Sequence, residues 1–285
     1  MSLPGRAAVA SDGTRYEQSS AAGLPAVVLI HGLGLNRQMW QWQTPAVASH
    51  YRVITYDLYG HGESPPPPEA PSLALFARQL LRLMDELRIE KAAVAGFSLG
   101  GMIARRFAMD HGDRLWALAI LNSPHRRSLE AHQAIQARVH LARRDGPQAT
   151  VEAALKRWFN DDFRQAHPEV MDLVRRWVKA NDRAAYADIY QVLVDGVGEL
   201  IAPNPPIACP SLVLTGEGDD GNSPAMTTEI AAEIPGARTV ILPGLRHMGM
   251  VEAPALFNQA LMAFLQSVEA GSVRQSASKG EQHGT

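Results

Sequence analysis

Short apolar runs alternate with helix-like stretches along most of the chain, and this alternation restricts the fold more than any other feature. Runs of this length and continuity are typical of strands buried on both faces of a parallel sheet. Between them, Ser72–Leu87 repeats apolar residues three and four positions apart, as an amphipathic helix does, with Ser72 at its N-cap. The pattern predicts an α/β protein with helices on both faces of a central sheet. The six apolar runs are Ala26–Ile30, Arg52–Tyr56, Ala92–Ala95, Leu115–Leu121, Leu212–Thr215 and Thr239–Leu242.

Two further strands precede this pattern. Asp12-Gly13 separates the short runs Ala7–Ala10 and Thr14–Glu17, and a two-residue Asp-Gly loop between such runs indicates a β-hairpin. We predict that both runs are antiparallel edge strands. The sheet would then have eight strands and be mostly parallel.

The alternation breaks between Pro124 and Pro206, where the sequence shows helical patterning and no strand-like run. We predict a helical lid at residues 125–206, inserted between late strands, and a core made of residues 1–124 and 207–268. The tail at residues 269–285 is rich in Ser, Gly, Lys and Gln, and this composition predicts disorder.

The composition limits the classes of partner. Of the 285 residues, 46% are hydrophobic and 20% are charged, which is enough apolar material for a large core. Lys and Arg number 27 and Asp and Glu number 29, so the net charge is −2. Because this charge gives no overall field to attract nucleic acid or an anionic membrane, we expect neither as a partner.

The apolar runs and the cysteine content bear on localisation. The longest runs are about a third of the roughly 20 residues that span a bilayer, and Met1–Gly13 lacks the apolar region of an export signal. Cys209 is the only cysteine, which excludes an intramolecular disulfide and a zinc site built from cysteines. We expect a soluble, cytoplasmic protein. The sequence leaves the oligomeric state open, a homodimer included.

The strongest local motif is Gly96-Phe97-Ser98-Leu99-Gly100-Gly101, which has the G-x-S-x-G form of a nucleophile elbow. It follows an apolar run directly and precedes the helical run Met102–Met109, so it has the strand-turn-helix context that this elbow requires. Its glycines leave room where side chains would collide with the neighbouring helix and strand. We predict that Ser98 is a catalytic nucleophile.

A serine nucleophile needs a base to take its proton and a carboxylate to orient that base, in the chain order Ser, Asp or Glu, His. Gly216–Gly221 directly follows the fifth apolar run, and His247 follows the sixth after a short loop. We predict that His247 is the base and that Asp219 is the acid. Asp220 and Glu217 lie in the same loop and remain alternatives for the acid.

Backbone N–H groups should stabilise the oxyanion that forms when the serine attacks. One is expected from Leu99, directly after the nucleophile, and the second from Leu33 in the loop His31-Gly32-Leu33-Gly34. We interpret His31 as a structural residue that ties loops together rather than as a base.

These motifs resemble the α/β-hydrolase family. Besides Gly96–Gly101, the chain has His31-Gly32 and the segment Asp57–Ser64, which is similar to that family's D-x-x-G-x-G-x-S loop. The resemblance spans roughly residues 26–264 and implies a triad of the predicted serine, aspartate and histidine.

Other segments resemble 3-oxoadipate enol-lactonases and their lactonase and esterase relatives. These segments are Arg157–Phe159, His167–Glu169, Asn181–Tyr186 and the loop Leu33–Trp40. One departure concerns the acid. The stretch from Asp219 to Pro224 is one residue longer than the commonest family form, so an alignment on the proline would assign Asp220 instead.

The resemblance implies a serine hydrolase that cleaves a carboxylic ester or lactone through an acyl-enzyme, without a metal or an organic cofactor. A serine at the elbow argues against the haloalkane dehalogenases and epoxide hydrolases of this fold, which use an aspartate there. Alternatives on the same triad are a carbon–carbon bond hydrolase and a cofactor-free haloperoxidase or perhydrolase. An alternative from another class is a non-catalytic ligand-binding protein of the same fold.

An enol-lactone substrate would carry a carboxylate, which arginine binds well because its planar guanidinium donates two parallel hydrogen bonds. Arg126, Arg127 and Arg157 are the candidates for this contact. Trp40 and Trp158 are candidates for the apolar walls of the substrate pocket.

Overall fold

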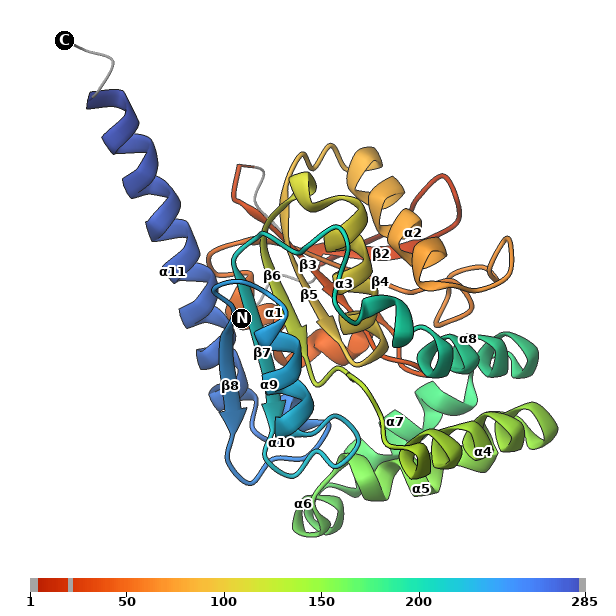
Figure 1. Cartoon of the computed structure of the whole chain (residues 1–285). Coiled ribbons are helices and arrows are strands. Elements are labelled where there is room, and N and C mark those ends of the chain that lie inside the picture. The colour runs from red at the N-terminus through yellow and green to blue at the C-terminus, as the bar shows by residue number, and fades with distance from the viewer. Residues whose placement is uncertain (1–4, 20–22, 282–285) are drawn as a thin grey trace.

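An eight-stranded sheet runs through the middle of the molecule in the computed structural model, which describes residues 5–19 and 23–281, with the backbone alone from residue 272 on (Figure 1). The strands are β1 (Arg6–Val9), β2 (Arg15–Ser19), β3 (Ala26–Ile30), β4 (Arg52–Tyr56), β5 (Ala92–Phe97), β6 (Leu115–Leu121), β7 (Ser211–Gly216) and β8 (Arg238–Leu242). Their order in the sheet is β1-β2-β4-β3-β5-β6-β7-β8. β2 is antiparallel to both of its neighbours, and all other neighbouring pairs are parallel. The mostly parallel eight-stranded sheet predicted from the sequence is confirmed.

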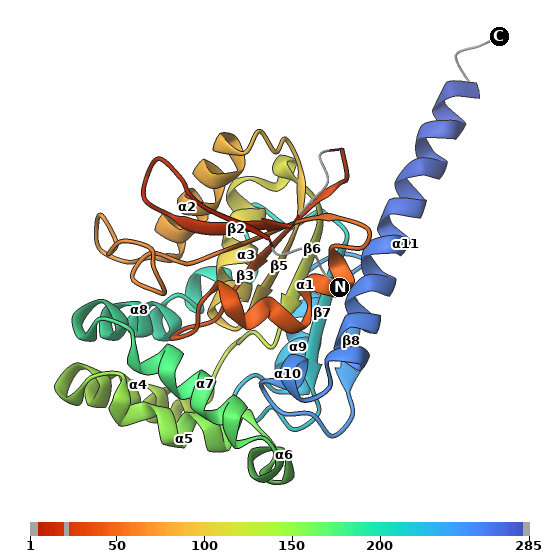
Figure 2. The ribbon, with the colours of Figure 1, turned by 180° about the vertical axis from the view of Figure 1, so that it is seen from behind.

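Helices cover both faces of this sheet (Figures 1 and 2). One face packs against α2 (Leu73–Glu86), α3 (Leu99–Asp110) and α9 (Pro224–Ala232). The other packs against the 3-10 helix η1 (Arg37–Trp42) and the helices α1 (Thr44–Val47), α10 (Gly249–Glu252) and α11 (Pro254–Glu281).

The central strand β3 shows why the sequence pattern predicts this arrangement. Val28 and Ile30 point into one hydrophobic core, Val27 and Leu29 point into the other, and all four are at most 1% exposed. Because side chains alternate between the two faces of a strand, a strand covered on both faces needs apolar residues at successive positions.

The chain between β6 and β7 is helical. It forms α4 (Leu129–Asp145), α5 (Gln148–Trp158), α6 (Asp161–Ala166), α7 (Pro168–Lys179) and α8 (Arg183–Asp195), followed by the 3-10 helix η3 (Gly198–Leu200). Figures 1 and 2 show these helices grouped at the end of the sheet where the parallel strands finish. This is the end at which parallel α/β sheets carry their sites. The action of this helical segment as a lid remains a prediction.

Two sequence predictions differ from the structure. Both hairpin runs were expected at the edge of the sheet, but only β1 lies there, because the second side of β2 pairs with β4 (Tyr16 opposite Tyr56). Residues 269–285 were expected to be disordered, whereas α11 continues as a helix to Glu281, and residues 282–285 lie outside the described part of the chain. Helix propagation is easier than nucleation, so a helix that begins on the core can extend into residues of moderate propensity.

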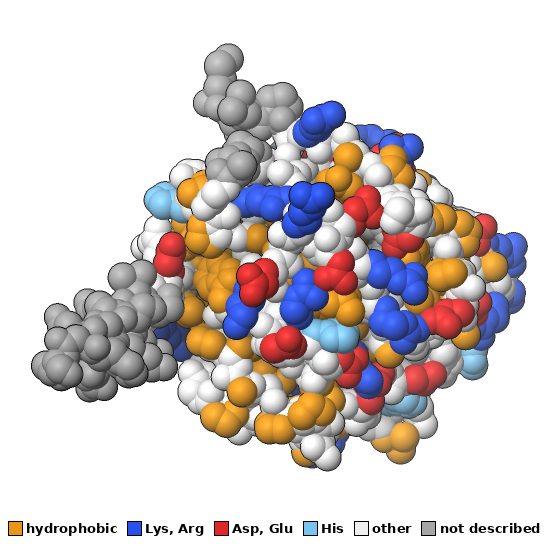
Figure 3. Space-filling model, turned by 90° about the horizontal axis from the view of Figure 1, so that it is seen from above, with side chains coloured by type: hydrophobic (Ala, Val, Ile, Leu, Met, Phe, Trp, Pro, Cys, Tyr) orange, Lys and Arg blue, Asp and Glu red, His pale blue; other side chains and the backbone are white. Residues whose placement is uncertain are grey.

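The outer surface carries charges of both signs. From the side shown in Figure 3, Lys and Arg side chains are interspersed with Asp and Glu, and neither sign gathers into a large patch. Within the described residues, no helix is both long enough and apolar enough to cross a membrane.

Candidate active site

Ser98 lies in a sharp turn between β5 and α3. Its backbone has φ 55° and ψ −113°, a conformation that residues with a side chain rarely adopt. The backbone N–H of Ser98 donates to Leu121 O (2.8 Å), and its carbonyl accepts from Ser123 Oγ (3.0 Å), so bonds on both sides hold the turn. The turn therefore keeps the hydroxyl-bearing residue at the end of the sheet.

The glycines around Ser98 allow the elbow to pack closely, as the sequence predicts. A Cβ atom at Gly96 would overlap the Gly100 carbonyl, and one at Gly100 would overlap the carbonyl of Ile30 in the adjacent strand. Because each collision would be with backbone, a larger residue at either position would displace the strand, the helix or the serine itself.

His247 and Asp219 form a buried hydrogen-bonded pair. The Nδ1 atom of His247 lies 2.7 Å from Asp219 Oδ2, and the two side chains are 7% and 2% exposed. The imidazole also packs against the rings of Phe97 and Trp158, with centroids 4.7 and 5.9 Å away. A carboxylate on Nδ1 fixes the ring orientation and leaves Nε2 for proton exchange.

The Asp219 carboxylate is itself held by several donors. Its Oδ2 atom accepts from Asn122 Nδ2 (2.9 Å) and lies 3.4 Å from Thr215 Oγ1. Its Oδ1 atom accepts from the backbone N–H groups of Gly221 (3.2 Å) and Asn222 (3.1 Å). These contacts fix the orientation of the Asp219 carboxylate toward the His247 imidazole.

The alternative acids lie elsewhere in the same loop. Asp220 is exposed and lines the rim of the cavity described next, and Glu217 is exposed and accepts from Gly244 N (2.9 Å). Of the three carboxylates considered from the sequence, Asp219 is the one bonded to the His247 imidazole.

Ser98, Asp219 and His247 line one cavity of about 290 Å³. Core residues such as Phe97 line one part of its wall, and residues of α4, α5 and α8 line the rest. Its volume is at the lower end of the range for small-molecule sites. The geometry thus brings together, in one pocket, the three side chains that the sequence nominates for catalysis.

The two predicted oxyanion donors belong to the loop after β3 and to the start of α3. Leu33 lines the cavity beside Ser98. Leu99 is the first residue of α3, and the first backbone bond of that helix runs from Gly101 N to Ser98 O (3.0 Å). N–H groups of a first turn have no acceptor within their own helix, so the Leu99 N–H is suited to receive a developing negative charge.

Two histidines brace the loop that carries Leu33. His31 Nε2 accepts from Leu58 N and His61 Nε2 accepts from Gly34 N, both at 3.0 Å. Burial lowers the pKa of His31 to about 4 and that of His61 to about 3, so both rings are neutral and can accept. His31 therefore ties loops together, as interpreted from the sequence.

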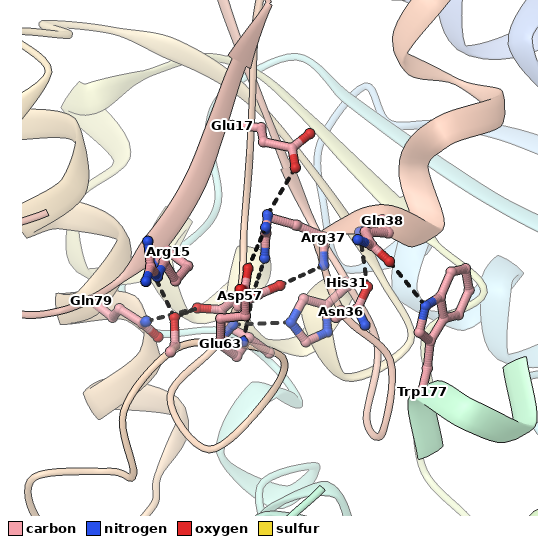
Figure 4. A network of polar contacts seen from close by, with 12 residues as sticks. Arg15, Glu17, His31, Asn36, Arg37, Gln38, Asp57, Glu63, Gln79 and Trp177 are labelled. Atoms are coloured by element: carbon pink, nitrogen blue, oxygen red, sulfur yellow. Dashed lines mark hydrogen bonds and ion pairs between the residues drawn. The ribbon is translucent and has the colours of Figure 1, made fainter. Parts of the chain in front are cut away.

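A buried arginine connects the same loop to β4 (Figure 4). Asp57 receives the backbone N–H of Arg37 (2.7 Å) and its Nη1 atom (2.5 Å), while Nε and Nη2 of Arg37 reach Glu17 (3.1 Å) and Glu63 (2.6 Å). A Cβ at Gly62 would overlap the Asp57 carboxylate, which explains the second glycine of the D-x-x-G-x-G-x-S segment. The network fixes the loop after β3 against the loop after β4.

The loop that carries His247 is bonded to the helical segment above it. Met248 N donates to Trp158 O (2.9 Å), and Arg246 Nη1 donates to Lys156 O (2.8 Å). Asn160 contributes three bonds, from Nδ2 to Gly244 O (2.9 Å), from Nδ2 to Glu252 Oε2 (3.0 Å) and from its backbone N to Glu252 Oε1 (2.5 Å). We call residues 156–160 the α5 strap, because they hold this loop in place.

Two predicted pocket residues lie outside the cavity. Trp40 is fully buried in the hydrophobic core beneath the site, and Arg126 is exposed. Trp158, Arg127 and Arg157 do line the cavity, as the sequence suggests. Side-chain direction within a loop depends on tertiary packing, which explains why two adjacent arginines differ.

The cavity wall contains further residues that sequence reasoning missed. Arg138 on α4 and Tyr186 and Tyr190 on α8 all face it. The mainly helical spacing of apolar residues in this segment could have marked the tyrosines as inward-facing, but gave no sign of the arginine. Among the described residues, no group of three His, Cys, Asp or Glu side chains is placed to hold a metal ion.

Comparisons with known proteins identify the family of this chain. A family model described as the alpha/beta hydrolase family matches residues 27–260. The chain is 27% identical to 3-oxoadipate enol-lactonase 2 of Acinetobacter baylyi, over 88% of this chain and 92% of that protein. It is also 27% identical to the (E)-2-((N-methylformamido)methylene)succinate hydrolase of the same organism, over 88% of this chain and 93% of the other.

A solved structure is similar over almost the whole chain. The crystal structure of the enol-lactonase from Burkholderia xenovorans LB400 superposes with a TM-score of 0.84 and 30% sequence identity. The match covers 92% of this chain and 100% of that one, so it includes the helical segment as well as the sheet.

Proposed function

The chain belongs to the alpha/beta hydrolase family, and we propose that within this family it is a serine hydrolase that cleaves a carboxylic ester or lactone through an acyl-enzyme. One observation carries the proposal. Asp219 Oδ2 lies 2.7 Å from His247 Nδ1 and so orients the imidazole. The imidazole lines the same cavity as Ser98, whose backbone has a positive φ at the elbow. Nucleophile, base and orienting acid are what acyl transfer to a serine requires.

In the proposed mechanism, the Ser98 hydroxyl oxygen attacks the substrate carbonyl while His247 Nε2 takes its proton. The carbonyl oxygen becomes an oxyanion that accepts hydrogen bonds from the N–H groups of Leu33 and Leu99. The tetrahedral intermediate collapses, and His247 gives the proton to the leaving alcohol or enol oxygen. Water then attacks the acyl-enzyme with His247 as base, which releases the acid and regenerates Ser98.

A lactone with a carboxylate is the preferred substrate within this class. The chain is similar in sequence to a 3-oxoadipate enol-lactonase and similar in structure to an enol-lactonase. Arg127 and Arg157 line the cavity, and a guanidinium pairs well with a carboxylate. Both facts support a lactonase activity like that of the 3-oxoadipate enol-lactonases, on a substrate that carries at least one carboxylate.

The test is hydrolysis of short-chain p-nitrophenyl esters and a lactone panel by the wild type and by Ser98→Ala. We expect turnover by the wild type and a loss of at least about 10³-fold in kcat for Ser98→Ala, because the nucleophile is removed. Ser49→Ala, a change at an exposed serine, is the matched control and should behave as the wild type. Undiminished turnover by Ser98→Ala would refute the acyl-enzyme.

Fluorophosphonate labelling gives an independent check. A covalent adduct on Ser98 that is absent from Ser98→Ala and weak in His247→Ala would show an activated serine. The ratio of lactone to ester turnover then ranks the two substrate classes.

A further inference from the structure

Three guanidinium groups line the part of the cavity formed by the helical segment. Arg138 lies on α4 and Arg157 on α5, and Arg127 lies in the stretch that leads into α4. Ser98 and His247 line the core side of the same cavity. A ligand with its carbonyl at Ser98 would therefore extend its other end toward these arginines.

These arginines differ from most others in their partners. Ten other arginines in the described part of the chain pair with an Asp or Glu. Instead, Arg138 Nε donates to the phenol oxygen of Tyr190 (3.0 Å), and Arg157 Nη1 donates to the backbone carbonyl of Ala153 (3.0 Å). Both of these acceptors are neutral, so they leave the positive charges uncompensated.

The charge of Arg138 also repels the charges of Arg127 and Arg157. Burial first and the positive charge of Arg138 second lower the pKa of Arg127 to about 10. The pKa of Arg157 is lowered in the same direction, by partial desolvation first and by Arg138 second, while the residue as a whole is exposed. Arg138 is thus the centre of a like-charge cluster, and an anion bound among the three would relieve the repulsion.

The two acidic side chains on the cavity wall are not paired with these arginines. Asp219 is hydrogen-bonded to His247, and Asp220 is exposed on the loop that follows β7. The carboxylates on the wall thus lie in the loop after β7, whereas the three guanidiniums lie on the helical segment between β6 and β7. A single carboxylate would offset only one of the three guanidinium charges.

We infer that the substrate carries two carboxylates on the part that fills the arginine-lined end, in addition to the ester or lactone carbonyl at Ser98. This inference rests on the proposed function and adds the substrate class to it. Three guanidiniums give each of two carboxylates a bidentate partner and leave the third shared between them. The cavity of about 290 Å³ has room for a small di- or tricarboxylic framework.

The experiment measures binding of product-like acids to Ser98→Ala by isothermal titration calorimetry at constant ionic strength. Butyrate, glutarate and propane-1,2,3-tricarboxylate carry one, two and three carboxylates, of which one stands for the acid that hydrolysis would release at Ser98. We expect the Kd to fall at least tenfold at each step. A charge-assisted hydrogen bond is worth enough to account for such a factor.

Arginine variants in the same background locate the effect. Arg138→Met should weaken binding of the tricarboxylate at least tenfold and leave that of butyrate within about twofold. Arg138→Lys keeps the positive charge but loses the planar guanidinium. Its affinity for the tricarboxylate should therefore lie between those of Ser98→Ala alone and of Arg138→Met. An unchanged melting temperature of the Arg138 variants shows that the fold is intact. Arg126→Met is the matched control, since Arg126 is exposed beside Arg127 and should leave all three affinities unchanged.

Two results would overturn the inference. Equal affinities for glutarate and the tricarboxylate would show that one carboxylate saturates the site, and a loss of affinity as large in Arg126→Met as in Arg138→Met would show a general surface effect. The binding test is independent of the test of hydrolysis, because binding to Ser98→Ala requires no turnover. Tight tricarboxylate binding, together with no turnover of any ester or lactone by the wild type, would refute the proposed hydrolase activity and support the inferred carboxylate-binding site.

Discussion

At the scale of single residues, the surroundings of three histidines separate structural from catalytic roles. His31 and His61 are buried against each other with ring centroids 5.1 Å apart, and burial keeps both neutral through the physiological pH range. Each serves as a fixed acceptor for a backbone N–H. His247 has a carboxylate on Nδ1 and lines the cavity, so it combines an oriented ring with access to substrate.

The acid of the proposed triad can be tested by one pair of variants. Asp219→Asn keeps an oxygen for the N–H groups of Gly221 and Asn222 but presents an amide donor to His247 Nδ1, which favours the wrong tautomer. We expect kcat to fall about 10³- to 10⁴-fold with the fold retained. Asp220→Asn, at the exposed neighbour, should stay within about threefold, measured with the same p-nitrophenyl ester. The opposite ranking would assign the role to Asp220.

The sequence predicts most of this site, and the exceptions have a common cause. Ser98 and His247 are predictable because each follows a recognisable strand, and parallel strands end at the same edge of the sheet. The choice between Asp219 and Asp220 stays open in the sequence, because both lie in one short loop whose turns decide which carboxylate points inward. Arg126 was wrongly expected in the pocket for the same reason.

At the scale of elements, the strands are predictable and the inner wall of the helical segment is not. β3, β4 and β6 have the predicted bounds, because burial on both faces demands continuous apolar runs. α4 buries only Ile135, Val139 and Ala142, so its pattern is too weak to show which other side chains face the cavity. Arg138 therefore becomes visible as a pocket residue only when α4, α5 and α8 are seen together.

The α5 strap gives a testable link between elements. Arg246 Nη1 reaches the carbonyls of Lys156 (2.8 Å) and Phe159 (3.4 Å) from the residue next to His247. Arg246→Met keeps the apolar stem and removes these bonds, worth about 1 kcal/mol each. We expect kcat to fall about threefold to tenfold while KM changes less, because a looser loop misplaces the base rather than the substrate.

Arg238→Met is the control for this variant. Arg238 begins β8 and donates to Ser267 Oγ (2.8 Å), so its loss affects the opposite end of the same strand without touching the strap. Equal effects of the two variants on kcat, or a lower melting temperature of Arg246→Met with unchanged kcat, would reduce the strap to a stabilising contact.

At the scale of the whole molecule, one segment stands apart from the packed layers. Figures 1 and 2 both show the last turns of α11 extending away from the sheet and from the helical segment. The first part of the same helix packs on the core, where Phe257, Leu261 and Leu265 are at most 1% exposed. Tyr51 also reaches α11, since its hydroxyl donates to Glu269 (3.2 Å). The functional boundary of the domain should therefore fall just beyond Glu269.

Truncation after Gly271 tests this boundary. A helical end that projects from the packed layers adds little stability, because a stretch of about ten residues is marginal as a helix on its own. We expect the melting temperature to stay within about 2 °C of the wild type, which corresponds to less than about 1 kcal/mol for a chain of this size, and kcat to be unchanged. Truncation after Phe264 is the contrasting variant, since it removes Leu265 from the core and the Tyr51 contact and should lower the melting temperature by several degrees. A large fall already after Gly271 would place the projecting turns among the elements that hold the fold together.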